Sequence, residues 1–387
     1  MVRCNYILGA FFAALTLYQS VGLTKACQVP VFRYALERWA ADTYRLAVFH
    51  NGPLSDEQQD VVASVGYDVN LELLTIDAGK MSAAERIRFG DVQVIKGQML
   101  GRLYYPIESR LRDKPIWEGD LTRDVLMGIV DSPVRRRIAK DILAGESAVW
   151  VILNSGNREA DDRIKKTLNG HIDSIVQWLE IPEGVAGPGE LERVASGEVA
   201  MEDVLRSTIP LKVSFTSLVI EKNDPAEQFF VKMLTGFVPA LIEQYPRQPL
   251  VFPVFGRGRT LDGISEEMLN EELMAAAGSY ICGACSCEVK RENPGIDLVM
   301  TMGWDEVIEG SAVVVDKKLP PLEGVGDLVA SVNPLSSSAA VIESDQLTEG
   351  DLASRRSLPV MSYLGIFCFV MLLGLAAFTV LYQRRSH

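Results

Sequence analysis

The stretch Leu46-Ala47-Val48-Phe49-His50, followed by Asn51-Gly52-Pro53, decides how the first half of the chain is interpreted. A short apolar run that ends in turn-forming residues is typical of a buried strand. Ser55 then offers an N-cap for a helix, and the alternating segment 70–76 predicts a second strand. A strand, a helix and a strand in this order indicate an α/β sheet that is covered by helices.

The second half of the chain repeats this rhythm. Residues 148–153 form a continuous apolar run, and further strands are predicted over 211–221 and 250–255. Pro253 interrupts the last of these, which indicates an edge strand or a bulge. Since amphipathic helical patterns separate the apolar runs, we expect two related three-layer α/β units.

The first unit resembles a known family. Strands are predicted at 101–106 and 114–119 before a helix at 121–130, so that strand–helix–strand is followed by strand–strand–helix. This order resembles the thioredoxin fold over roughly residues 44–130. The segment Pro115-Ile116-Trp117-Glu118-Gly119-Asp120-Leu121-Thr122 is similar to the last strand of that family as it runs through a glycine into the C-terminal helix. The resemblance implies a Cys-x-x-Cys pair after the first strand, but His50-Asn51-Gly52-Pro53 occupies that place, so the usual redox centre is absent there.

A connecting helix is predicted after Ser132, with Pro133 at its first position and Gly145 just beyond its end. We place the boundary between the units here, with residues 28–131 in the first unit and 132–315 in the second. The consecutive arginines of this helix fan around it, and we expect a solvated face for Arg135, Arg136 and Arg137.

The N-terminal residues 1–26 have the pattern of an export signal. Arg3 precedes an apolar stretch, and the small residues Thr24 and Ala26 predict cleavage before Cys27. An uncleaved anchor and a lipoprotein with Cys27 as its lipidated residue are the alternatives. Lys25 is unfavourable for a lipoprotein signal.

Near the other end, residues 358–382 contain no charged side chain and would span about 37 Å as a helix. This predicts one transmembrane helix. The following tail, 383–387, contains two arginines and is expected in the cytoplasm. Residues 316–357 contain Ser, Pro and Gly without a periodic pattern, and they predict a flexible tether. We therefore expect a single-pass protein of the cell membrane whose ectodomain lies outside the cytoplasm.

Composition narrows the function. Asp and Glu number 51 against 38 Lys and Arg, giving a net charge of −13, so no nucleic-acid partner is expected. The chain contains three histidines and no G-x-S-x-G, H-E-x-x-H or EF-hand pattern. We predict no catalytic residue, and we expect the lipid bilayer and an envelope protein as partners. The expected role is a non-catalytic binding or scaffolding component of a cell-envelope assembly.

The strongest candidate for chemistry is Cys282-Gly283-Ala284-Cys285-Ser286-Cys287, which follows a helix that we expect Ser265 to cap. Outside the cytoplasm, clustered thiols oxidise or bind a partner. Structural disulfides are one hypothesis, because Cys27, Cys282, Cys285 and Cys287 give the exported part an even count. The pairs would be Cys282–Cys285 and Cys27–Cys287.

Two other interpretations of this motif stay open, and together they form the alternative function. Cys282-Gly-Ala-Cys285 is similar to a thioredoxin active site, where a helix N-terminus lowers the pKa of a thiol. The three cysteines of the motif could instead bind Zn(II) or Cu(I), with Cys27 or Glu288 as a fourth ligand. No cofactor is expected otherwise.

Two weaker candidates complete the set. Arg257 and Arg259, in Gly256-Arg257-Gly258-Arg259, could bind an anion, with a plain turn as the alternative. His50 could act as a base, but no nucleophile lies near it in the sequence, so a structural histidine is favoured.

Overall fold

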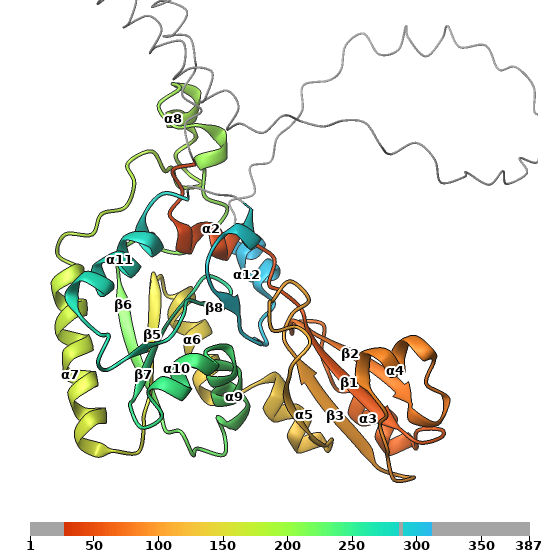
Figure 1. The fold of residues 1–387 in the computed structure, drawn as a ribbon. Helices are drawn as coiled ribbons and strands as arrows, with labels where there is room; N and C mark the ends of the chain where they lie inside the picture. The colour runs from red at the N-terminus through yellow and green to blue at the C-terminus, as the bar shows by residue number, and fades with distance from the viewer. Residues whose placement is uncertain (1–26, 286–288, 312–387) are drawn as a thin grey trace, which may run out of the picture. The chain divides into compact units, whose positions relative to one another are not determined.

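A computed structural model describes residues 27–285 and 289–311 of the chain (Figure 1). These residues form helices and two separate sheets, which confirms the mixed α/β class. The predicted export signal at 1–26, tether at 316–357, transmembrane helix at 358–382 and tail at 383–387 lie outside the described residues.

The first sheet has four strands in the order β2-β1-β3-β4. β1 is parallel to β2 and antiparallel to β3, and β3 is antiparallel to β4. A parallel pair needs a crossover connection, which α3 provides. In chain order the elements are β1 (Tyr44–His50), α3 (Asp56–Ala63), β2 (Leu71–Asp77), the 3-10 turn η1 (Ala78–Lys80), α4 (Ala83–Phe89), β3 (Met99–Tyr104), β4 (Pro115–Asp120) and α5 (Arg123–Val130).

Helices cover both faces of this sheet, because alternate side chains of β1 point to opposite sides. Leu46 belongs to the same buried cluster as Val61 of α3. Phe49 packs on the other face against Phe89 of α4, with ring centroids 5.5 Å apart. The predicted cap of α3 is confirmed, since the Ser55 side chain accepts a hydrogen bond from the backbone N–H of Gln58.

The second sheet has six strands, in the order β10-β8-β7-β5-β6 with β9 paired to β7. β5 is parallel to β6 and antiparallel to β7, as β1 is to β2 and β3. The elements after α5 are α6 (Pro133–Leu143), β5 (Ala148–Leu153), α7 (Arg158–Ile175), α8 (Leu191–Ala195), η2 (Met201–Asp203), β6 (Phe215–Ile220), α9 (Gln228–Phe237), α10 (Pro239–Gln244), β7 (Leu250–Phe255), β8 (Arg259–Thr260), β9 (Ile264–Ser265), α11 (Glu271–Cys282), η3 (Lys290–Glu292), β10 (Ile296–Asp297) and α12 (Trp304–Ser311).

Every residue of β5 is buried, as expected for a strand enclosed on both faces. Val151 belongs to a cluster with Ile138 of α6 and Phe230 of α9. Trp150, on the other face, belongs to a cluster with Ile164 of α7. Figure 1 shows α7 along the flank of this sheet and α6 and α9 on its other side. The second sheet is therefore the middle of three layers.

Pro253 lies in a central strand, so the prediction of an edge strand was wrong. β7 is covered by β5 on one side and by two short strands on the other. β9 pairs with Leu250 and Val251, whereas β8 pairs with Val254 and Phe255. Pro253 falls in the interval between these two pairings, where its missing N–H breaks no ladder.

The connecting helix α6 starts as predicted, with Ser132 as its N-cap and Pro133 in its first turn. The expectation of a solvated Arg135 was wrong, because this side chain is only 1 % exposed. Its guanidinium donates hydrogen bonds to the carbonyls of Gly128 (2.7 Å) and Ile129 (2.8 Å). These carbonyls belong to the last turn of α5, where no further helical N–H is available. Arg135 therefore completes the end of one helix from the start of the next.

Residues 28–37 were predicted to belong to the first unit, but this segment packs with the second sheet. All of α2 (Val31–Glu37) is buried, and Phe32 belongs to the same cluster as Phe255 of β7. Arg33 and Glu37 form a buried ion pair at 2.8 Å. Glu37 also accepts a hydrogen bond of 2.7 Å from the hydroxyl of Ser207. This segment thus completes a core whose other members lie far along the chain.

Residues 296–302 join the two sheets. At the second sheet, Ile296 and Asp297 form β10, and the backbone N–H of Leu298 bonds to Gly258. At the first sheet, Asn70 donates to the carbonyl of Leu298 (3.0 Å) and accepts from the N–H of Met300 (2.8 Å). The two sheets therefore share one continuous strand-like connection.

Candidate functional site

A cavity of about 750 Å³ lies between the loop that follows β3 and the segment 289–296. Apolar side chains line part of it, including Leu111 and Phe237. The charged side chains Asp42, Arg259 and Lys290 line it as well. The volume is within the usual range of ligand pockets, which makes this the main candidate for a binding site.

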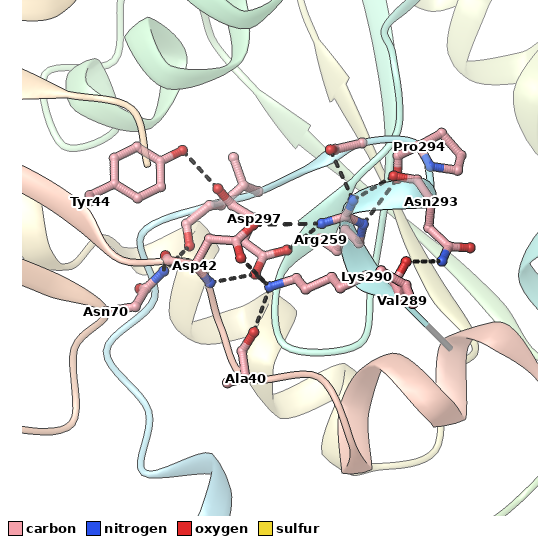
Figure 2. A network of polar contacts seen from close by, with 12 residues as sticks. Ala40, Asp42, Tyr44, Asn70, Arg259, Val289, Lys290, Asn293, Pro294 and Asp297 are labelled. Carbon is pink, nitrogen blue, oxygen red and sulfur yellow. Dashed lines mark hydrogen bonds and ion pairs between the residues drawn. The ribbon is translucent and has the colours of Figure 1, made fainter. Parts of the chain in front are cut away.

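Four of the charged groups at or beside the cavity form a network, drawn in Figure 2. Lys290 donates from Nζ to Asp42 Oδ1 at 2.7 Å and, in a short contact, to Asp297 Oδ2. Its third hydrogen bond goes to the carbonyl of Ala40. On the other side of Asp297, Arg259 Nη1 donates to Oδ1 at 3.0 Å. Two positive charges thus face two negative charges.

The fold brings these residues together from distant positions. Arg259 in β8 is directly opposite Asp297 in β10, because the two strands are paired in that register. Asp42 lies in the connection between α2 and β1, and its backbone N–H donates to Asp297 Oδ2 at 2.7 Å. Lys290 is the first residue of η3. The network therefore depends on the arrival of the N-terminal segment at the second sheet.

The electrostatics of the network favour structure over catalysis. Three oxygens receive the three protons of the Lys290 ammonium, so it has no lone pair with which to act as a base. Burial raises the pKa of Asp42, and the charge of Asp297 raises this pKa further, whereas the Lys290 ammonium lowers it. Asp42 is therefore a carboxylate held in a partly dry position by a cation beside it.

The two arginines predicted to bind an anion lie in different surroundings. Arg259 also donates to the carbonyls of Asn293, Pro294 and Gly295, at 2.9 to 3.0 Å. Arg257 donates instead to the carbonyl of Leu36 and to a carboxylate oxygen of α12. Their guanidinium groups are thus directed at protein oxygens, and anion binding by Arg257 and Arg259 stays a prediction.

The cysteine motif lies beside the N-terminal segment. α11 begins after Asn270, which caps it, so the expectation that Ser265 caps this helix was wrong. The N–H of Val31 bonds to the carbonyl of Gly283, and the N–H of Cys285 bonds to the carbonyl of Val29, both at 3.0 Å. The two segments are thus antiparallel neighbours, about 250 residues apart in sequence.

Three of the four predicted cysteines are brought into one apolar cluster. Cys27, Cys282 and Cys285 are all buried there, with exposed fractions of 6 % or less. Cys27 and Cys282 are free thiols in this structure. The predicted Cys282–Cys285 bridge is therefore not formed in this structure. Cys287 lies outside the described residues, so the Cys27–Cys287 pairing stays a prediction.

Burial controls the chemistry of the described thiols. It raises the pKa of Cys282 to about 12, although a hydrogen bond with Ser147 acts in the opposite direction. The pKa of Cys27 is raised by burial and also by the charge of Asp203. Both groups are protonated near neutral pH, and a thiol attacks disulfides and binds metals only as the thiolate.

No group of three or more His, Cys, Asp or Glu side chains is placed to hold a metal ion within residues 27–285 and 289–311. The proposed Zn(II) or Cu(I) set includes Cys287 and Glu288, which are not among these residues. His50, the candidate base, ends β1, and its Nδ1 lies 2.7 Å from the carbonyl of Gly52. This contact holds the turn after the strand, in agreement with a structural histidine.

Sequence reasoning missed the cavity and three members of its network, Asp42, Lys290 and Asp297. One signal for Asp297 was present, because this acid interrupts the apolar run from Ile296 to Met302. A buried acid in such a run usually has a cationic partner. Nothing in the sequence identified Lys290 as that partner.

The helices in the described part of the chain include none that is both long enough and apolar enough to cross a bilayer. The predicted span at 358–382 lies outside that part. No protein-family model matches the sequence, and no curated protein is significantly similar to it.

Proposed function

We propose that this protein is a non-catalytic binding or scaffolding component of a cell-envelope assembly. A C-terminal transmembrane helix at 358–382 anchors it, and its α/β ectodomain lies outside the cytoplasm and binds an envelope protein. Each sheet, in this proposal, is a thioredoxin-like unit that has a binding role instead of a redox role.

The topology of both sheets supports the thioredoxin-like part of this proposal. Strand–helix–strand followed by strand–strand–helix occurs once from β1 to α5 and again from β5 to α11. The sheet orders β2-β1-β3-β4 and β6-β5-β7-β8 correspond strand by strand. In both units the first strand runs into a turn without cysteine, Asn51-Gly52-Pro53 in one and Asn154-Ser155-Gly156 in the other.

The burial of the Cys282 thiol is the single observation that carries the non-catalytic role. This side chain is 0 % exposed and its pKa is raised to about 12. A redox cysteine has the opposite properties, since it is accessible and its pKa is lowered. The polar network at the cavity also has its charges balanced within the protein.

Thiol chemistry tests this proposal. In detergent-solubilised full-length protein, we expect iodoacetamide at pH 8 to leave Cys282 unmodified until denaturant is added. We also expect no catalysis of insulin reduction. The proposal is wrong if insulin is reduced and the Cys282→Ala variant loses that activity at an unchanged melting temperature.

Membrane attachment has its own test. A variant that ends at residue 357 should move from the membrane fraction to the soluble exported fraction. Protease added to spheroplasts should digest the ectodomain of the full-length protein. An ectodomain that resists protease while it remains on the cytosolic side would contradict the proposed location.

One observation favours the alternative, a thiol–disulfide or metal-binding protein. The antiparallel contact of residues 29–31 with 283–285 brings the segment of Cys27 beside the cysteine motif. Metal analysis of the native protein and mass spectrometry without reduction separate the possibilities. About one zinc or copper ion per chain would support the metal site, whereas a Cys27–Cys287 crosslink would support structural disulfides.

A further inference from the structure

We propose that the cavity beside the Lys290 network binds a peptide segment in which an acidic and a basic side chain flank an apolar one. The inference rests on the proposed binding role and names the chemistry of the partner. It follows from which of the charges that line the cavity have partners inside the protein.

The Lys290 network, at and beside the cavity, has no net charge. Lys290 and Arg259 contact Asp42 and Asp297, two cations with two carboxylates. Because each charge has an opposite neighbour within the protein, the network has little free energy to gain from an ion in the cavity. Ligand recognition then depends on the remaining side chains.

Two arginines are among the exposed side chains that line the cavity, which we call its rim. Arg110 belongs to the loop after β3, and Arg291 belongs to η3. Both are exposed, and neither forms a hydrogen bond or an ion pair with another residue in the described part of the chain. A guanidinium in this state can bind a carboxylate through two parallel hydrogen bonds.

The same rim carries two carboxylates. Glu108 and Asp262 line the cavity, are exposed, and likewise have no ion pair with a described residue. A simple anion would therefore be attracted by the arginines and repelled by the acids. A simple cation would be attracted by the acids and repelled by the arginines. A ligand with both charges can satisfy both pairs at once.

Apolar side chains line the same cavity. Leu111, Phe237 and Ile296 line the cavity, together with Val289, which is 46 % exposed. An apolar side chain of a ligand would cover this surface and remove it from water. Charges of both signs and apolar groups that line one cavity of about 750 Å³ match a short stretch of polypeptide.

Calorimetry on the full-length protein in detergent tests this inference. The probes are the tripeptides Lys-Leu-Glu and Glu-Leu-Lys, since the direction of the bound chain is not fixed by the charges. Glutarate, a dianion, and cadaverine, a dication, are the comparisons that carry charges of one sign only. We expect saturable binding of at least one tripeptide, weaker at higher salt. Glutarate and cadaverine should bind at least tenfold more weakly.

Variants assign the binding to the cavity. Arg110→Gln, Arg291→Gln, Glu108→Gln and Asp262→Asn should each weaken tripeptide binding by about three- to tenfold, the loss expected for one exposed charge-assisted contact. The matched control is Arg158→Gln, because Arg158 is 95 % exposed on α7 and does not line the cavity. Its affinity should not change.

Three results would overturn the inference. They are the absence of saturable binding by both tripeptides, equal affinity for glutarate, and equal effects of the rim variants and the control. Such a result would leave the proposed function standing if the thiols are inert and the ectodomain is anchored outside the cytoplasm. Catalysed thiol exchange would instead reject the proposed function, whatever the tripeptides do.

Discussion

The two sheets share their strand order but differ in where their cores come from. The first sheet and its helices are built from one continuous stretch, from Tyr44 to Val130. The second sheet needs α2 from the N-terminal side, and its cysteine cluster needs the segment at 27–31. The same strand order is thus completed by neighbouring residues in the first sheet and by residues distant in sequence in the second. We therefore expect substitutions in these distant segments to lower the free energy of unfolding more than substitutions in the first sheet.

The largest effect is expected at the ion pair that joins α2 to the second sheet. Glu37→Ala removes the acceptor for Arg33, leaving a buried guanidinium without its charge partner. The free energy of unfolding should fall by about 3–5 kcal/mol. Urea unfolding followed by tryptophan fluorescence measures this, with Arg158→Ala as the exposed control. A loss below about 1 kcal/mol would contradict the importance we give to α2.

Matched substitutions that create a cavity in each sheet test the difference between the sheets. Leu103→Ala in β3 and Leu250→Ala in β7 remove the same atoms from buried positions, and each should cost about 2–5 kcal/mol. Hydrogen exchange reports which amides lose protection. We expect Leu250→Ala to expose amides of both sheets and Leu103→Ala mainly those of the first. Equal effects of the two variants would show that the sheets unfold as one unit.

The turn after the first strand should behave alike in both sheets. Gly52 and Gly156 have φ angles of 83° and 88°, and a Cβ at either position would meet no atom within 4 Å. Alanine there would suffer backbone strain alone, about 1–2 kcal/mol. Thermal melting of Gly52→Ala and Gly156→Ala measures the loss. Unequal losses would mean that the two turns are not equivalent.

The smallest effect is expected in the pH dependence of folding stability, through Asp42 beside the cavity. The pKa of Asp42 in the folded protein lies above that of an unfolded aspartate. Between these two pKa values, the folded protein holds a proton that the unfolded chain has released. The stability contributed by Asp42 is thus fully present below the ordinary carboxyl pKa and is lost as the pH rises through the raised pKa. Relative to Asp42→Asn, the wild type should lose stability from acidic to neutral pH. Unfolding free energies of both proteins over this range check the sign. A wild type that becomes more stable relative to Asp42→Asn as the pH rises would contradict it.

Local sequence patterns predicted most of the sheet strands. The buried run at 148–153 is β5 with the same bounds, and the apolar run at 46–50 falls within β1. Helix signals also held where a side chain acts on its own backbone, as Ser132 and Pro133 do at α6. These features depend on residues close together in the chain, and that is the information a single sequence contains.

Features that depend on distant partners were missed. The two-residue strands β8, β9 and β10 are too short to show a period. β8 and β9 form by pairing with β7, and β10 forms by pairing with β8. The Arg135 side chain is buried because its guanidinium binds the carbonyl of Gly128 near the end of α5. The cavity network joins residues 42, 259, 290 and 297, and no local pattern relates them.

The contact between Val31 and Gly283 has a consequence for biogenesis. The ribosome releases the first of these residues about 250 codons before the second, which at 5–20 residues per second is a delay of about 10–50 s. During most of that time α2 lacks native neighbours such as Ser207 and Phe255, because these residues are also synthesised late. The first sheet can fold while the chain is still being synthesised, whereas the second sheet must wait for almost all of the described residues. A nascent chain that stalls between these points would expose the apolar side chains of α2, which are the kind of surface that chaperones bind.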